Sequence, residues 1–272
     1  MVEAKRSVGL PPFPGIPLRD VPVPRAQVWG DDKFGTAVLT EYNERVRLDF
    51  DENPFLRMFK SAGGVVHGSN PFGTCLVDMI VRPAVRVTTP PDLQAILLAR
   101  GQTASTIEIR GGYKDVALVL RSVKEPNSYI AERLVEQLDP KIEWPVAVYL
   151  SGLKLVKDPK SPCSLSFKFT SETRALHAPI LDSKSGHFDD AHVDGATGLP
   201  TRIGGTGRYL YSTTEGLCRL YLGRGSSIDT IWDELGNTQA DGRVAFIDNA
   251  VPPEKVSEFV AGLDAAAKLL ER

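Results

Sequence analysis

Residues 185–208 read SGHFDDAHVDGATGLPTRIGGTGR and combine imidazole, carboxylate and glycine in one short stretch. His187, Asp190, His192 and Asp194 form a ligand set that zinc, manganese and iron accept in proteins. If the segment is extended, Asp190, His192 and Asp194 project to one side, because side chains in a strand alternate with a period of two. The pattern predicts a divalent metal, which would activate water for hydrolysis.

The same composition also fits a polar surface connection, because turns prefer Asp, Gly and Ser. A calcium loop of the EF-hand type is excluded. Thr201 stands where that loop requires a glutamate as its twelfth ligand, and Pro200 precedes it. The segment is therefore expected to be either a metal site or an exposed loop.

The glycines of the same segment form a second candidate site. Gly204, Gly205 and Gly207 leave backbone amides that could surround a cofactor phosphate, and Arg208 could steady an anionic group of a substrate. Known phosphate loops lead into a helix, whose N-terminus contributes its dipole. The residues that follow, YLYSTT, are instead typical of a strand. This context favours a hairpin or a flexible lid over a phosphate loop.

Two further sets of residues could carry chemistry. His177 could act as a general base, since histidine titrates near neutral pH, or it could be a half-buried structural residue. Glu108 and Arg110 on one predicted strand, with Asp78 on another, weakly resemble the Asp and Glu-x-Lys arrangement of metal-dependent nuclease cores, with arginine replacing lysine. The three tryptophans, Trp29, Trp144 and Trp232, are scattered and are expected in the core.

Proline dominates the start of the chain. Residues 10–24 carry six prolines, which exclude a helix or a central strand and favour an extended arm over residues 1–25. The arm also carries apolar side chains, so it is predicted to lie across the domain or across a neighbouring subunit of a homo-oligomer. A solvated tail is the alternative.

The remaining chain predicts a strand-rich α+β fold, with a mixed or antiparallel sheet and four to five helices. Predicted strands include residues 36–50, 74–81, 84–89, 115–122, 144–150, 164–170, 208–214 and 216–222. Predicted helices cover residues 90–101, 126–138 and 226–236, and a C-terminal amphipathic helix over 252–272 is expected to pack on the sheet. Residues 26–272 are predicted to form a single globular domain, with a possible division near 157–162, where the sequence KDPKSP is typical of a linker.

Composition narrows the function classes. The net charge of −2 and the pI near 6.1 give no support to general nucleic-acid binding. No apolar run is long enough for a membrane helix, and three widely spaced cysteines do not predict a disulfide framework. We therefore expect a cytoplasmic protein in which Cys75 and Cys218, which lie in apolar runs, are buried thiols.

Three functions follow from these observations. The first is a metal-dependent hydrolytic enzyme that acts on a small or anionic substrate through residues 185–208. The second is a noncatalytic binding or assembly protein that oligomerises through its proline-rich arm. The third is a metal-dependent nuclease.

Overall fold

A computed structural model of the chain describes residues 26–28, 33–57, 60–62, 65–83, 85–98, 112–223, 227–238 and 241–248. Its helices are α1 (Lys33–Asp49), α2 (Pro71–Val81), α3 (Pro90–Leu98) and α5 (Ser128–Val135), with short 3-10 turns η1 (Pro54–Leu56), η2 (Pro179–Asp182) and η3 (Asp190–His192). Its strands are β1 (Ala26–Val28), β2 (Lys60–Ala62), β3 (Val65–His67), β4 (Val85–Val87), β5 (Lys114–Leu120), β6 (Val146–Tyr149), β7 (Lys154–Lys157), β8 (Leu165–Lys168), β9 (Ala175–His177), β10 (Gly186–Phe188), β11 (Arg208–Tyr211), β12 (Leu217–Leu222), β13 (Ile228–Asp229) and β14 (Ala245–Asp248).

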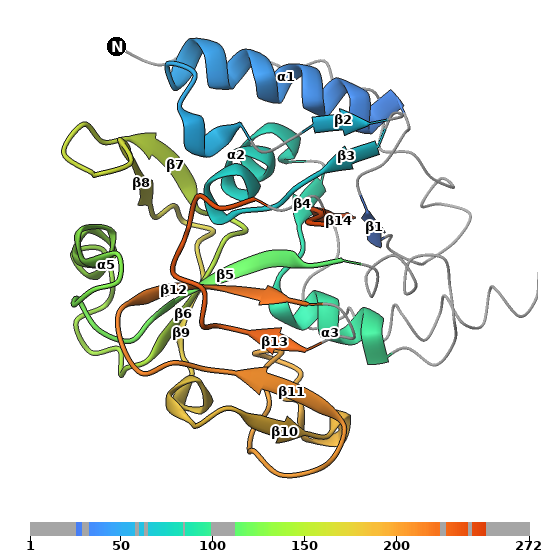
Figure 1. The fold of residues 1–272 in the computed structure, drawn as a ribbon, viewed down its shortest axis with the longest axis vertical. Coiled ribbons are helices and arrows are strands. Elements are labelled where there is room, and N and C mark those ends of the chain that lie inside the picture. Colours follow the sequence, from blue (N-terminus) through green and yellow to red (C-terminus); the bar gives the residue numbers. More distant parts are fainter. Residues whose placement is uncertain are drawn as a thin grey trace, which may run out of the picture.

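Seven strands form the main sheet, in the order β10-β11-β13-β12-β5-β6-β9 (Figure 1). The sheet is mixed, because β11 and β13 run parallel while the other neighbouring pairs run antiparallel. A smaller sheet has the order β1-β14-β4, and β2-β3 and β7-β8 are separate hairpins. The predicted α+β fold, with a mixed sheet and four helices in the described part of the chain, is confirmed.

The main sheet separates two buried hydrophobic clusters. Val146 and Val148 of β6 face a cluster that includes α1, α2 and α5, whereas Ala147 and Tyr149 face a second cluster that includes α3. This alternation follows from the pleat of a strand, in which successive side chains point to opposite faces. The centre of the sheet is therefore covered on both faces.

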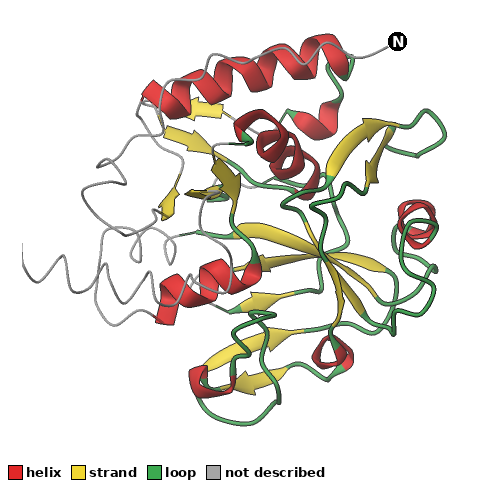
Figure 2. Ribbon diagram, turned by 180° about the vertical axis from the view of Figure 1, so that it is seen from behind, coloured by secondary structure: helices red, strands yellow, loops and turns green. Residues whose placement is uncertain are grey.

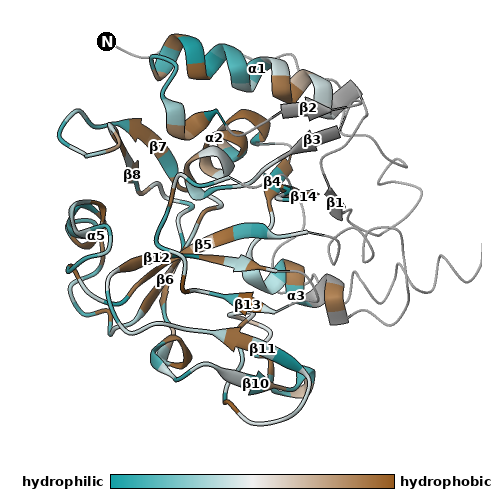
Figure 3. Cartoon of the chain, viewed as in Figure 1, coloured by the Kyte–Doolittle hydropathy of each residue, from teal (hydrophilic) through white to brown (hydrophobic). Residues whose placement is uncertain are grey.

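Residues 36–50, predicted as a strand, form most of α1, so that prediction is wrong. The partial alternation near its end is local, whereas the buried Val38, Tyr42 and Val46 recur every four residues over the whole segment. A four-residue spacing places these side chains along one face of a helix. Figure 3 shows hydrophobic and hydrophilic residues mixed along α1, which packs on α2 in the view from behind (Figure 2).

Residues 74–81, also predicted as a strand, lie in α2, which is buried on nearly every side. A helix of this kind has no polar face, so its sequence cannot be distinguished from a buried strand by periodicity. Asn70 begins the helix by accepting a hydrogen bond from the Gly73 amide, and Pro71 occupies the first turn. Asp78 therefore lies on a helix and not on the strand that the nuclease hypothesis needed.

Residues 227–238 do not form the predicted helix over 226–236. They contain the short strand β13, followed by a segment that crosses β12 and reaches the start of α2 (Figure 1). The backbone oxygen of Trp232 accepts a hydrogen bond from the Arg219 amide, which ties this segment to β12. We call residues 231–238 the crossing segment.

Several smaller predictions concern single segments or residues of the chain. The KDPKSP sequence at 157–162 lies at the turn between β7 and β8. Cys75 and Cys218 are buried, as expected. The arm over residues 10–24 and the helix over 252–272 lie outside the described residues. Among the described helices, none has both the length and the apolar character needed to cross a bilayer. A cytoplasmic location stays a prediction.

Candidate functional site

Residues 185–208 form an edge of the main sheet. β10 pairs with β11 so that His187 lies opposite Tyr209, and η3 follows directly after the strand. The Gly204 amide donates a hydrogen bond to the His187 backbone oxygen, which joins the glycine-rich part to β10. The segment is thus integrated into the sheet by backbone hydrogen bonds.

The glycine-rich loop surrounds a carboxylate of the protein itself. The amides of Thr206 and Gly207 each lie 3.2 Å from Oδ1 of Asp189 and donate hydrogen bonds to it. Gly204 and Gly205 have φ angles of 137° and 126°, which L side chains rarely adopt, and a Cβ atom at Gly205 would lie 2.4 Å from Oδ2 of Asp189. Of the glycine amides predicted for a cofactor phosphate, that of Gly207 therefore binds Asp189, and that of Gly204 binds the His187 backbone oxygen.

Each predicted metal ligand has a different local role. His187 packs edge-on against the Tyr209 ring, with centroids 4.8 Å apart. His192 faces the Arg202 guanidinium through Nε2, and Asp194 accepts hydrogen bonds from the amides at 196 and 197 within its own turn. Asp190 forms an ion pair with Arg208 (3.1 Å). The described residues contain no group of three or more His, Cys, Asp or Glu side chains placed to hold a metal ion.

The two predicted catalytic residues lie at opposite edges of the seven-stranded sheet. Arg208 begins β11, next to edge strand β10, where its guanidinium contacts Gln94 and lies 5.0 Å from the centroid of the Phe188 ring. His177 ends edge strand β9, with Nε2 3.8 Å from a carboxylate oxygen of Glu143. The sheet order therefore separates the two side chains by several strands.

A row of aromatic side chains on one face of the main sheet was not predicted. Tyr209 and Tyr211 of β11 have ring centroids 4.5 Å apart, and Tyr209 also contacts His187 of β10. Further along the same face, Tyr221 of β12 contacts Tyr113, which immediately precedes β5, with ring centroids 5.3 Å apart. We call these five side chains, together with Trp232 of the crossing segment, the aromatic face.

The aromatic face is open over β10, β11 and β13 because the helices do not cover the whole sheet, whereas Tyr113 at its other end is buried. Leu217 of β12 and Leu118 and Leu120 of β5 face the cluster that contains α2 and α5. Towards β13, β11 and β10, the buried Ile228, Leu210 and Phe188 face the opposite cluster. The side chains that alternate with them therefore point away from that cluster. Tyr211 remains 41% exposed, and Ile231 and Trp232 nearby remain 43% and 38% exposed.

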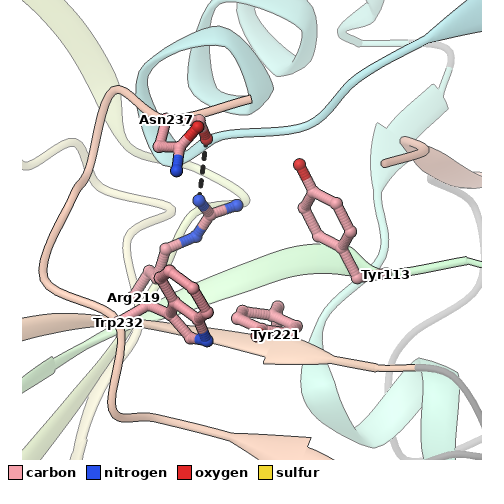
Figure 4. Close-up of a pocket in the computed structure, with 5 residues that line it drawn as sticks. All are labelled: Tyr113, Arg219, Tyr221, Trp232 and Asn237. Carbon is pink, nitrogen blue, oxygen red and sulfur yellow. Dashed lines mark hydrogen bonds between the residues drawn. The ribbon is translucent and has the colours of Figure 1, made fainter. Parts of the chain in front are cut away.

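A small pocket lies where the crossing segment passes over the sheet. It has a cavity volume of about 50 Å³ and is lined by the side chains of Tyr113, Arg219, Tyr221, Trp232 and Asn237 (Figure 4). In Figure 4 the Trp232 indole and the two tyrosine rings surround the Arg219 side chain, whose Nη1 atom donates to the Asn237 backbone oxygen. The pocket therefore joins two strands to the crossing segment.

Arg219 is held by a buried ion pair. Its Nε and Nη2 atoms each lie 2.6 Å from a carboxylate oxygen of Asp115, which also accepts a hydrogen bond from the Ser69 hydroxyl. Burial by itself lowers the pKa of the guanidinium, but Asp115 and the Tyr113 hydroxyl raise it by more, so the net pKa is raised. The bidentate geometry fixes the guanidinium plane against the rings of Tyr113 and Tyr221.

Asp229 lies between the two ends of the aromatic face. It is opposite Tyr211 in the parallel pairing and opposite Tyr221 in the antiparallel pairing. Its carboxylate accepts hydrogen bonds from the Tyr221 hydroxyl (3.0 Å), the Ile231 amide (3.1 Å) and the Trp232 side chain. Burial nevertheless raises the pKa of Asp229, because these contacts only partly replace the lost solvent.

Part of this face could have been found in the sequence. Tyr209 and Tyr211, Arg219 and Tyr221, and Tyr113 and Asp115 are each separated by one residue in a segment predicted as strand or adjoining one. Such pairs share one face of a sheet. The role of Trp232 could not be found, because residues 226–236 were predicted to be helical. The expectation that Trp144 and Trp232 lie in the core is wrong, since both are more than a third exposed.

Comparisons with known proteins add no family: no protein-family model, curated protein or solved structure matches the chain.

Proposed function

We propose that this protein is a noncatalytic binding protein that holds its ligand on the aromatic face. The single observation that carries the proposal is the row of aromatic rings on β10, β11 and β12, on a part of the sheet that no described helix covers. The buried Tyr113 lies at the inner end of this row. Of the predicted functions, the second, a binding protein, fits this geometry best.

Aromatic rings in such a position favour binding for a physical reason. A tyrosine or tryptophan ring presents a large apolar surface with a polar atom at its end, and it loses little conformational entropy when a ligand packs on it. Exposed apolar side chains that cluster, as Tyr211, Ile231 and Trp232 do here, are typical of interaction sites. The row therefore offers a preformed stacking surface.

The residues predicted for catalysis support the same choice. Arg208 and His177 lie at opposite edges of the sheet, so they cannot act on one substrate group. Asp190, His192 and Asp194 each already contact a donor within the same segment or on β11. A metal there would have to displace these partners. The hydrolase and nuclease functions stay predictions.

The proposal is tested by mapping where small organic probes bind. Isotopically labelled protein is titrated with phenol, isopropanol and a methyl glycoside, and the amide and indole resonances are followed by NMR. We expect the largest shifts at the Trp232 indole and along β11 and β13. In Trp232→Leu, which has no indole at this position, the shifts along β11 and β13 should be lost. Trp144→Leu is the matched control, because Trp144 is similarly exposed (37%) but lies outside the aromatic face. Equal shifts at both indoles, or the largest shifts elsewhere, would contradict the proposal.

A further inference from the structure

Asp229 is an acidic side chain placed among the rings of the aromatic face. Its strand neighbours on both sides are tyrosines, Tyr211 and Tyr221, and Trp232 hydrogen-bonds to its carboxylate. We call Asp229, Tyr211, Tyr221 and Trp232 the aromatic–carboxylate site. Three electron-rich rings around one carboxylate concentrate negative potential in a small volume.

The charges around this site are not balanced. Arg219, the nearest cation on β12, is already paired with Asp115 through two hydrogen bonds. Among the described residues, no lysine or arginine forms an ion pair with Asp229 itself. The adjacent Asp233 and Glu234 of the crossing segment are exposed and add negative charge. Coulombic attraction therefore favours a positively charged ligand and disfavours a polyanion.

The pocket already contains one cation bound in the manner expected for such a ligand. The Arg219 guanidinium lies 5.2 Å from the Tyr113 ring centroid and 5.3 Å from the Tyr221 ring centroid. Both distances fall within the range of cation–π interactions. This face of the sheet thus stabilises the internal cation Arg219 with two tyrosine rings and the carboxylate of Asp115. At its more exposed side, the same face presents a second carboxylate, that of Asp229, next to further aromatic rings.

We infer that the aromatic–carboxylate site binds an organic cation of the alkylammonium class, such as a quaternary ammonium group. The inference rests on the proposed function, because it names the chemical class of the ligand on the aromatic face. Cation–π attraction to Trp232, Tyr211 and Tyr221 and the charge of Asp229 would supply the affinity. A methylated ammonium group suits this site because its weak hydration reduces the penalty of leaving water.

The test compares choline with its neutral isostere, in which carbon replaces the quaternary nitrogen. The two molecules have the same shape, so a difference in affinity reports the charge. Full-length protein is titrated with each and the Trp232 indole resonance is followed. We expect choline to bind about tenfold more tightly than the isostere. In Asp229→Asn the preference for choline should become smaller, because only the cation–π part of the attraction remains. The control Asp139→Asn, which changes an exposed aspartate after α5, should leave the ratio unchanged.

The outcomes separate this inference from the proposed function. Equal affinities in the wild-type protein would overturn the cation inference and leave the binding function standing. If neither molecule shifts the Trp232 indole and the neutral probes above also fail, the binding function is overturned with it. Tighter binding of a thymidine oligonucleotide than of choline would likewise overturn the inference. Trp232→Leu provides a second variant if Asp229→Asn does not fold. Because this variant lacks the indole, binding is followed at the amide resonances of β11 and β13, and choline should bind about tenfold more weakly.

Discussion

The ion pair between Arg219 and Asp115 offers the sharpest test of how the aromatic face is built. Arg219→Met keeps the aliphatic part of the side chain and removes the guanidinium. It leaves Asp115 with the Ser69 hydroxyl as a hydrogen-bond donor to its carboxylate, and it leaves the backbone oxygens of Ser69 and Asn237 without the donors that Arg219 supplies. Because both side chains of the pair are almost completely buried, water cannot replace these contacts without a change in structure.

The expected magnitude follows from this burial. Removing one member of a buried ion pair leaves an uncompensated charge and destabilises a protein by about 3–5 kcal/mol. At roughly 2–4 °C for each kcal/mol in a chain of this size, the melting temperature should fall by about 6–20 °C. Asp115→Asn should destabilise the protein by a similar amount. The double variant should lose about 2 kcal/mol less than the sum of the two single variants, because neither charge is then left alone.

Urea unfolding at neutral pH, followed by circular dichroism, measures these free energies. Arg133→Met is the matched control: it makes the same substitution in the ion pair with Glu136, in which both side chains are well exposed. That variant should change the free energy of unfolding by less than about 1 kcal/mol. A loss below about 1 kcal/mol for Arg219→Met, or strict additivity in the double variant, would show that the ion pair does not anchor the pocket.

Three other measurements test separate parts of the structure. Gly198→Ala should destabilise the protein by at least about 1–3 kcal/mol, because φ is 67° and the new Cβ would lie 2.3 Å from the backbone at the start of α3. The control Gly195→Ala, with open space around the new Cβ, should change the free energy of unfolding by less than about 0.5 kcal/mol. Equal melting temperatures for the two variants would contradict this. Asp189→Ala should speed amide hydrogen exchange at Gly207 and leave exchange in β12 unchanged, and unaltered exchange at Gly207 would refute the carboxylate contact. Burial raises the pKa of Asp229 above its usual 3.8, so the folded state binds this proton more tightly. Asp229 therefore contributes a loss of stability as pH rises from about 4 through the raised pKa, in addition to the contribution of the buried Asp78. Asp229→Asn should make the decline smaller than in the wild-type protein, and parallel stability curves for the two proteins would contradict the assignment.

The sequence predicted the fold class because several segments have an unambiguous pattern. Strands β5 and β6 carry continuous apolar runs, and α3 has prolines at its start with Asp92 in its first turn. The prediction failed where a segment showed both a helical and a strand-like periodicity, or showed neither. α1 has a local alternation near its end, and α2 is buried on nearly every side. In both segments tertiary packing, which a sequence pattern does not contain, decides the structure.

The candidate site was harder to predict than the fold. In the segment with the most chemically active residue types, 185–208, the carboxylates of Asp189 and Asp190 are bound within the segment. Asp189 accepts hydrogen bonds from the amides of Thr206 and Gly207, and Asp190 forms an ion pair with Arg208. The aromatic face comes from residues up to 119 positions apart, Tyr113 and Trp232. Sequence analysis identifies reactive residues that lie close together along the chain. It does not identify a site whose residues are brought together by the order of the strands, on a part of the sheet that no described helix covers.

Strand β14 has a consequence for how the chain folds as it is synthesised. It lies between β1 and β4, so neither of those strands has its partner in the small sheet until residues 245–248 are available. A ribosome that adds 5–20 residues per second needs roughly 8–32 s to travel from β4 to β14. During that interval β4 lacks the strand that pairs with its edge, although its Val85 and Val87 are buried in the finished protein. The nascent chain therefore presents an apolar strand edge, of the kind that chaperones bind, until synthesis has reached β14.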